Sequence, residues 1–155
     1  MLTVYHGSTC CVEQPLAGVC RPNLDFGIGF YVTSLEEQAT RWALRTADLR
    51  HQTEAWLNTY LLDIDVCHAA PYRCRYFENY NADWLDFVVS CRQGGVLGQD
   101  YEIIEGGIAD DRVIRTIDLY IQRCTRSWWC IKGWICQCMK RCEFYFSLKN
   151  LASRS

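Results

Sequence analysis

Two stretches decide the expected fold: Tyr5-His6-Gly7-Ser8 and Gly29-Phe30-Tyr31-Val32-Thr33. The first closes a β-rich run over residues 2–6, and the second is itself a short β-rich run over residues 30–33. The loop Asp25-Phe26-Gly27-Ile28-Gly29 leads into the second run, and its glycines permit a bulge, a positive φ or the close approach of a ligand. His6 and Tyr31 are therefore candidate functional residues, although a structural histidine and a core tyrosine are the ordinary alternatives.

Composition limits the classes of protein that the chain can belong to. Its 155 residues, half of them apolar, suffice for one hydrophobic core. A net charge of −2 argues against a general binder of nucleic acids or membrane surfaces, since both need a basic face. No apolar run is long enough to span a bilayer, and no signal-type segment precedes the first expected strand. We therefore expect a cytoplasmic protein.

The eleven cysteines have an uneven distribution. Without an export signal, reduced thiols are favoured over disulfides. From about residue 124 the tail differs from the rest of the chain because cysteine and tryptophan crowd together in it, at Cys124, Trp128, Trp129, Cys130, Trp134, Cys136, Cys138 and Cys142.

The cysteines suggest two other kinds of site. A zinc-stabilised interaction module is one alternative, but only Cys138 and Cys142 approach the spacing of paired zinc ligands, and we assign no metal ligand. A thiol protease pair of Cys10 or Cys11 with His6 or His68 is the other, and it lacks an identifiable orienting residue.

The remaining pattern predicts helices and strands in a mixed order. Ser34 and Glu37 form a capping box for a helix whose apolar face comprises Leu35, Ala39, Trp42, Ala43 and Leu49. Alternation predicts a strand over residues 58–66. A second helix is expected over residues 82–92. Its inward-facing residues are Trp84, Leu85, Val88 and Val89.

Further along, a strand is expected over residues 101–104, followed by a turn at Gly106-Gly107. Asp110-Asp111 can cap a third helix, and residues 143–146 are the best late strand. No repeat or linker interrupts the chain, so residues 1–155 are expected to form one α+β domain.

The chain resembles the ADP-ribosyltransferase superfamily, in its His-Tyr-Glu branch, and more narrowly an uncharacterised bacterial family within it. The resemblance spans roughly residues 2–122 and rests on five strings in the family's order. Besides the two opening stretches with their loop, these are Ala39-Thr40-Arg41-Trp42-Ala43, Asp83-Trp84-Leu85-Asp86-Phe87-Val88 and the run from Tyr101 to Asp111. It implies a split sandwich of two short antiparallel sheets with flanking helices and with NAD, as substrate, between the sheets.

The resemblance also implies a role for each site residue. His6 would hold the adenosine ribose, Gly7 would offer backbone hydrogen bonds to the carboxamide, and Tyr31 would stack on nicotinamide. Ser8 and Gly29 would complete the NAD site, and Glu143, ahead of Phe144-Tyr145-Phe146, would be the catalytic glutamate.

The implied activity is transfer of ADP-ribose from NAD to a macromolecular acceptor, protein or nucleic acid, with release of nicotinamide. Such a protein could be the toxin of a bacterial toxin–antitoxin pair, with a cognate antitoxin as partner. The alternative is a catalytically inactive relative that binds only NAD or a partner.

Overall fold

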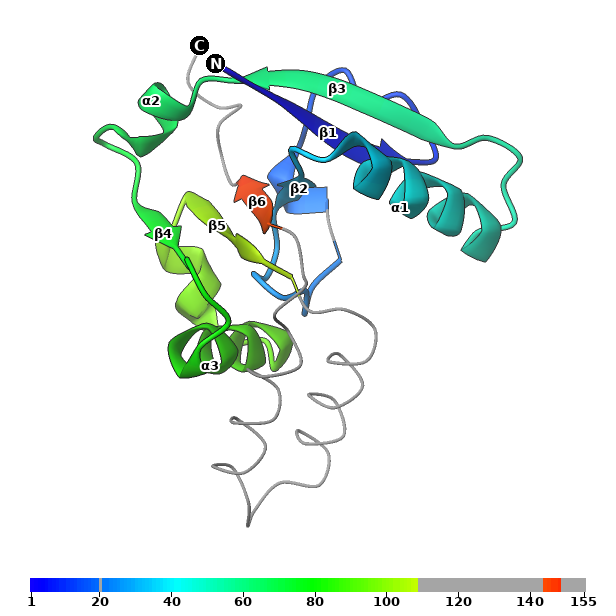
Figure 1. Ribbon diagram of the computed structural model, residues 1–155. Coiled ribbons are helices and arrows are strands. Elements are labelled where there is room, and N and C mark those ends of the chain that lie inside the picture. Colours follow the sequence, from blue (N-terminus) through cyan, green and yellow to red (C-terminus); the bar gives the residue numbers. More distant parts are fainter. Residues whose placement is uncertain (20, 109–143, 149–155) are drawn as a thin grey trace.

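Two β-sheets meet along one edge in the computed structural model, which describes residues 1–19, 21–108 and 144–148 (Figure 1). The first sheet pairs β1 (Leu2–Ser8) antiparallel with β3 (Trp56–Leu62), in a register that runs from Leu2↔Leu62 to Ser8↔Trp56. The second has the strand order β2-β6-β5-β4. A single bridge, Tyr5↔Thr33, joins the two sheets.

The second sheet is mixed, whereas two antiparallel sheets were expected. It contains β2 (Phe30–Val32), β6 (Phe144–Leu148), β5 (Ile103–Gly107) and β4 (Cys74–Tyr76). β6 is antiparallel to both of its neighbours, but β4 runs parallel to β5 because the helix α3 (Ala82–Arg92) lies between them in the chain. The fold is a small one that combines strands and helices, and it is consistent with the α+β class.

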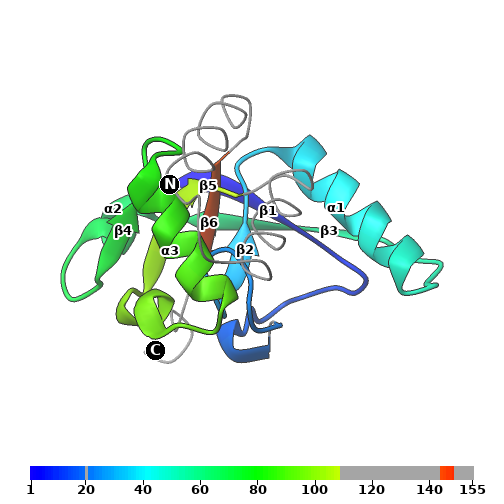
Figure 2. The ribbon, with the colours of Figure 1, turned by 90° about the horizontal axis from the view of Figure 1, so that it is seen from below.

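The main hydrophobic core lies between α3 and the second sheet (Figure 2). Asn81 caps the helix by accepting a hydrogen bond from the Trp84 amide. The Trp84 side chain is 0% exposed and its indole N–H donates to the Gly107 carbonyl at 2.8 Å. The expected helix over residues 82–92 and its inward face are confirmed. The buried members of this core are Phe26, Phe77, Trp84, Leu85, Phe87, Val88, Val89, Cys91 and Ile104.

Helix α1 (Glu36–Leu49) packs on β1 through small residues, its buried positions being Ala39, Ala43 and Ala47. Three residues expected in this face are exposed: Leu35 by 40%, Trp42 by 45% and Leu49 by 70%. A Cβ at Gly7 would lie 2.0 Å from the Ala39 carbonyl oxygen, so the helix sits almost directly on the strand's backbone. This close approach leaves room for alanines and excludes the larger apolar residues of the predicted face.

The start of α1 also differs from the expected capping box of Ser34 and Glu37. Leu35 is the N-cap and makes no side-chain capping bond. The hydroxyl of buried Thr33 instead accepts from the Leu35 amide at 3.2 Å and donates to the Gln38 side chain at 2.7 Å. Thr33 therefore fixes both the end of β2 and the start of the helix.

Two other boundaries are corrected. The strand expected over residues 58–66 ends at Leu62, because Asp63 caps the short helix α2 (Ile64–His68) by accepting from the Val66 amide. Gly106 and Gly107 lie inside β5 and form no turn. At these two positions the missing side chains make room for Phe77 and Tyr80.

Short 3₁₀ turns at Ala17–Val19 and Val96–Asp100 complete the described elements. β6 overlaps the expected late strand, whereas the helix expected after Asp110-Asp111 and the cysteine-rich tail lie outside the described residues. Within the part of the chain that the structure describes, every helix is too short or too polar to cross a bilayer.

Candidate functional site

The candidate site lies where β1 and β2 separate. The Tyr5 amide donates to the Thr33 carbonyl at 2.7 Å, and the Thr33 amide donates to the Tyr5 carbonyl at 3.0 Å. If this antiparallel ladder continued, Gly7 would be the next partner of Tyr31. Instead, Nδ1 of the His6 ring lies 2.7 Å from the Tyr31 carbonyl oxygen. A side chain therefore takes the acceptor that a continuing ladder would offer to the Gly7 amide.

The backbone of Gly7 faces the same edge of β1 as the backbone of Tyr5. Along a strand, the N–H and C=O groups of alternate residues point to the same edge, and those of Tyr5 point to β2. The N–H and C=O of Gly7 are thus directed to the side where the two strands part, away from β3. This orientation suits a polar group of a ligand that enters between them.

The proton on the His6 ring can be placed from its neighbours. Because a carbonyl only accepts, Nδ1 must carry the hydrogen that it donates to Tyr31. Burial lowers the pKa of His6 below its ordinary value, and the bond to the Tyr31 carbonyl opposes this only in part. The ring is therefore neutral near pH 7 and its Nε2 is a hydrogen-bond acceptor. The ring also lies against Phe30, with centroids 4.3 Å apart.

Tyr31 closes the loop that precedes β2. Its hydroxyl accepts from the Phe26 amide at 3.0 Å and donates to the Gly27 carbonyl at 2.8 Å. Gly27 has a φ of 77°, which confirms the positive φ considered for this loop, and Gly29 is buried just before β2. The Tyr31 ring is half-buried and parallel to that of Phe26. The tyrosine thus has a structural role whether or not a ligand stacks on it.

Ser8 belongs to a polar network that Asn58 organises, a residue that the sequence did not single out. The buried Asn58 amide donates to Ser8 Oγ at 3.1 Å and to the His6 and Cys10 carbonyls at 3.3 Å, and its oxygen accepts from the Val12 amide at 2.7 Å. Asn58 pairs with His6 across the sheet, and a polar residue at an inward strand position was the available signal. The network fixes residues 8–12 beside the site.

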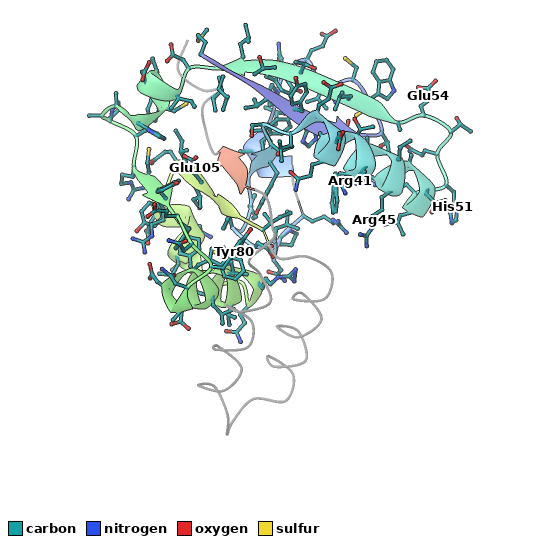
Figure 3. The ribbon with its side chains drawn as sticks, in the orientation of Figure 1. Arg41, Arg45, His51, Glu54, Tyr80 and Glu105 are labelled. Atoms are coloured by element: carbon teal, nitrogen blue, oxygen red, sulfur yellow. The ribbon has the colours of Figure 1, made fainter. Side chains whose placement is uncertain are left out.

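Glu143 lies outside the described residues, so its role stays a prediction. In the described strand that follows it, Ser147 is the register partner of Tyr31, and Phe144 pairs with Gly107. The half-buried side chain of Glu105 lies on β5 (Figure 3), and its Oε2 is 3.6 Å from Nε2 of His68 on α2. Burial raises the pKa of Glu105, and His68 opposes the rise. By register, Glu105 shares a row with Val32, so it projects from the sheet face opposite that of Tyr31.

Arg41 and Arg45 project from the side of α1 that faces away from β3, and both are exposed (Figure 3). Cys10 and Cys11 are exposed, and His6, their proposed partner in a protease pair, is bonded to Tyr31. Residues 1–19, 21–108 and 144–148 contain no group of three potential metal ligands. The cysteines considered for zinc lie outside those ranges.

Comparison with known proteins identifies a family for this chain. Residues 2–147 match the family described as "Protein of unknown function (DUF3990)". No curated protein and no solved structure matches the chain.

Proposed function

We propose that this chain, which belongs to the DUF3990 family, transfers ADP-ribose from NAD to a macromolecular acceptor and releases nicotinamide. The supporting observation is the bond from the His6 ring to the Tyr31 carbonyl, where the ladder between β1 and β2 would otherwise continue. It brings the histidine and the tyrosine of the resemblance into contact. Strand alternation directs the backbone N–H and C=O of Gly7 to the same side of β1.

The chemistry of NAD suits a site with few catalytic groups. Breaking the bond between the ribose C1′ and the nicotinamide nitrogen sends the electron pair to the ring, which leaves as neutral nicotinamide and needs no proton. An ordinary glycosidase needs a carboxylic acid for this step in addition to its second carboxylate. The acceptor's nucleophile forms the new bond to C1′, and its proton passes to water. One carboxylate can stabilise the positive charge that develops on the ribose.

The proposal gives each residue one task. His6 accepts a hydrogen bond from a ribose hydroxyl at Nε2, because its Nδ1 hydrogen is committed to Tyr31. Gly7 binds the carboxamide through its backbone and Tyr31 lies against the nicotinamide ring. Glu143 supplies the carboxylate. Ser8 and Gly29 shape the loops beside NAD, since the Ser8 hydroxyl already bonds to Asn58 and Cys10.

The biological setting is part of the same proposal. An enzyme of this kind in the bacterial cytoplasm would deplete NAD or modify a host macromolecule. It would then act as a toxin that needs a cognate antitoxin.

The second candidate function is binding of NAD or a partner without chemistry. One observation favours it: Tyr31 and Gly7 both have structural tasks, in closing the loop and in seating α1. Those tasks would preserve the shape of the site in a relative that had lost its catalytic carboxylate.

Labelled NAD separates the two functions. The purified chain, with and without cell lysate, is expected to release nicotinamide and to transfer label to macromolecules. Glu143→Gln should abolish release and leave NAD affinity within about twofold, because a group that acts in the transition state changes kcat more than binding. No release by the wild type, with NAD bound, would favour the non-catalytic relative.

Two further variants test the assignment of residues. Glu105→Gln is the matched carboxylate control and should leave release unchanged; loss of release in this variant alone would transfer the catalytic role from Glu143 to Glu105. Tyr31→Ala should weaken NAD binding more than Tyr31→Phe, which keeps the ring and loses the loop-closing hydroxyl. Equal affinity in all three proteins would remove Tyr31 from the stack.

A further inference from the structure

An ion pair between Asp25 and Arg92 joins the loop before β2 to the end of α3. Arg92 Nε lies 2.8 Å from Asp25 Oδ1, and the two side chains are 14% and 7% exposed. Three other ion pairs, His68–Glu105, Arg73–Glu102 and Arg75–Asp83, are more open to solvent. Arg92 is the last residue of α3, where a cation also interacts favourably with the helix dipole.

A buried pair of this kind is poorly explained by stability alone. Removing two charges from water costs free energy that their attraction recovers only with good geometry, so apolar residues of the same size often stabilise a fold equally well. Breaking one partner, by contrast, leaves an uncompensated charge in the interior. The pair therefore favours one arrangement of the loop strongly over others.

The loop that Asp25 begins is the one that holds Tyr31. Next to Asp25, Phe26 is fully buried in the core against α3, and its amide donates to the Tyr31 hydroxyl. The Gly27 amide donates to the Leu24 carbonyl at 2.9 Å, and the Gly27 carbonyl accepts from Tyr31. A displacement of Asp25 would therefore move both groups that the Tyr31 hydroxyl contacts.

A second contact supports the same attachment. Gly94, just beyond α3, has a φ of 80°, and a Cβ there would lie 3.6 Å from the Asn23 side-chain oxygen. Asn23 itself has a positive φ of 64°. The segment before Asp25 thus lies against the same end of α3 and adopts an uncommon backbone conformation there.

We propose that Asp25 and Arg92 are positioning residues for NAD: they anchor the loop to α3 and so set the place of Tyr31 relative to His6. Arg92 pairs with Asp25, and the backbone of the next two residues, 26–27, bonds to the Tyr31 hydroxyl. The Tyr31 carbonyl in turn bonds to the His6 ring. Neither Asp25 nor Arg92 needs to touch NAD. This inference rests on the proposed NAD-dependent activity.

The test is the kinetics of nicotinamide release by Asp25→Ala and Asp25→Asn in the full chain. Misplacing a group that binds the substrate without taking part in bond breaking raises KM more than it lowers kcat, so we expect KM for NAD to rise about tenfold in Asp25→Ala, with kcat within about threefold. Asp25→Asn keeps an oxygen for Arg92 and should show a smaller rise. Hydrogen exchange at the Phe26 amide should become faster in the order wild type, Asp25→Asn, Asp25→Ala.

Val88→Ala is the matched control for stability. Val88 is fully buried on α3, one turn before Arg92, and its truncation keeps both charged groups of the ion pair, so this variant should lower the melting temperature and leave KM unchanged. If Asp25→Ala lowers the melting temperature to the same degree and KM stays at the wild-type value, the positioning role is wrong. If the wild type neither releases nicotinamide nor binds NAD, the proposed function itself fails and the positioning role fails with it.

Discussion

The two long helices cover their sheets in opposite ways. α3 fills the space over the four-stranded sheet with large side chains, among them Trp84 and Leu85, which are fully buried. α1 lies on the two-stranded sheet through alanines and over Gly7, where helix and strand backbones nearly touch. The α3 side therefore buries more of the large apolar side chains, whereas on the α1 side the backbones of helix and strand approach closely. The candidate site lies between the two: Gly7 belongs to the α1 side, whereas the Tyr31 ring packs against the core beneath α3.

The largest expected effect is on the α3 side. Trp84→Ala should lower the free energy of unfolding by about 3–5 kcal/mol, because it leaves a large cavity and removes the donor to the Gly107 carbonyl. Urea denaturation measures it. The matched control, Trp42→Ala, removes a side chain that is 45% exposed and should cost less than about 1 kcal/mol. Equal losses in the two variants would contradict the contrast between the helices.

The next effect tests the close approach on the α1 side. Gly7→Ala should cost about 1–3 kcal/mol or more, because the added methyl group overlaps the Ala39 carbonyl and α1 must shift. Gly18→Ala is the control: nothing lies within 4 Å of its Cβ position, and the change should stay within about 0.5 kcal/mol. Denaturation curves of both variants decide the point, and a neutral Gly7→Ala would mean that the helix is not seated on the strand.

A smaller effect concerns the polar contacts that hold the loop beside β1. Asn58→Ala removes the acceptor of the Val12 amide and the donor to Ser8, and an unsatisfied buried group costs about 1–3 kcal/mol. Exposed Asn79→Ala serves as the control. Thermal unfolding together with hydrogen exchange at the Val12 amide measures the loss. An unchanged rate of hydrogen exchange at the Val12 amide would show that Asn58 does not protect this amide.

The smallest effect is the pH dependence that His6 contributes. Since burial lowers its folded pKa below the ordinary 6.5, the unfolded chain binds a proton first as the pH falls. The contribution of His6 to stability is therefore fully present above pH 6.5. It is lost as the pH falls below 6.5 toward the lower pKa of the folded state.

The contribution of Glu105 to stability has the opposite pH dependence, because the pKa of Glu105 is raised. That contribution is fully present below pH 4.5 and is lost as the pH rises. The difference in melting temperature between wild type and His6→Gln, followed from pH 7.5 to pH 5, isolates the histidine term. A difference that does not vary with pH would contradict the lowered pKa of His6.

Local patterns in the sequence predicted the elements whose signals are themselves local. The first strand, which extends to Ser8 and not only to the expected His6, the strand containing Tyr31 and the helix over residues 82–92 all follow from residue type and spacing. Trp42 was misplaced because the seating of α1 depends on Gly7, far away in the chain. In the sequence, Asp63 fits an alternating strand as well as a helix cap. In the folded chain it is a cap, because its side chain accepts a hydrogen bond from the Val66 amide.

The site could be predicted only in part for the same physical reason. Short sequence motifs identified His6 and Tyr31 as candidates. The structure brings the two residues into contact, which is consistent with a shared site. Asn58, Asp25 and Arg92 act through partners 46 to 67 residues away, and nothing in the sequence alone brings such pairs together. Glu143 falls outside the described residues, so its assignment remains a prediction.

The contact at Gly7 also has a genetic consequence. A single-base change in the first or second position of a glycine codon replaces glycine with a residue that carries a Cβ or with a stop. Because the Ala39 carbonyl occupies the place of that Cβ, each such replacement at position 7 must displace α1. In a mutational scan of the gene, codon 7 should tolerate only synonymous changes, whereas codon 18 should accept many substitutions.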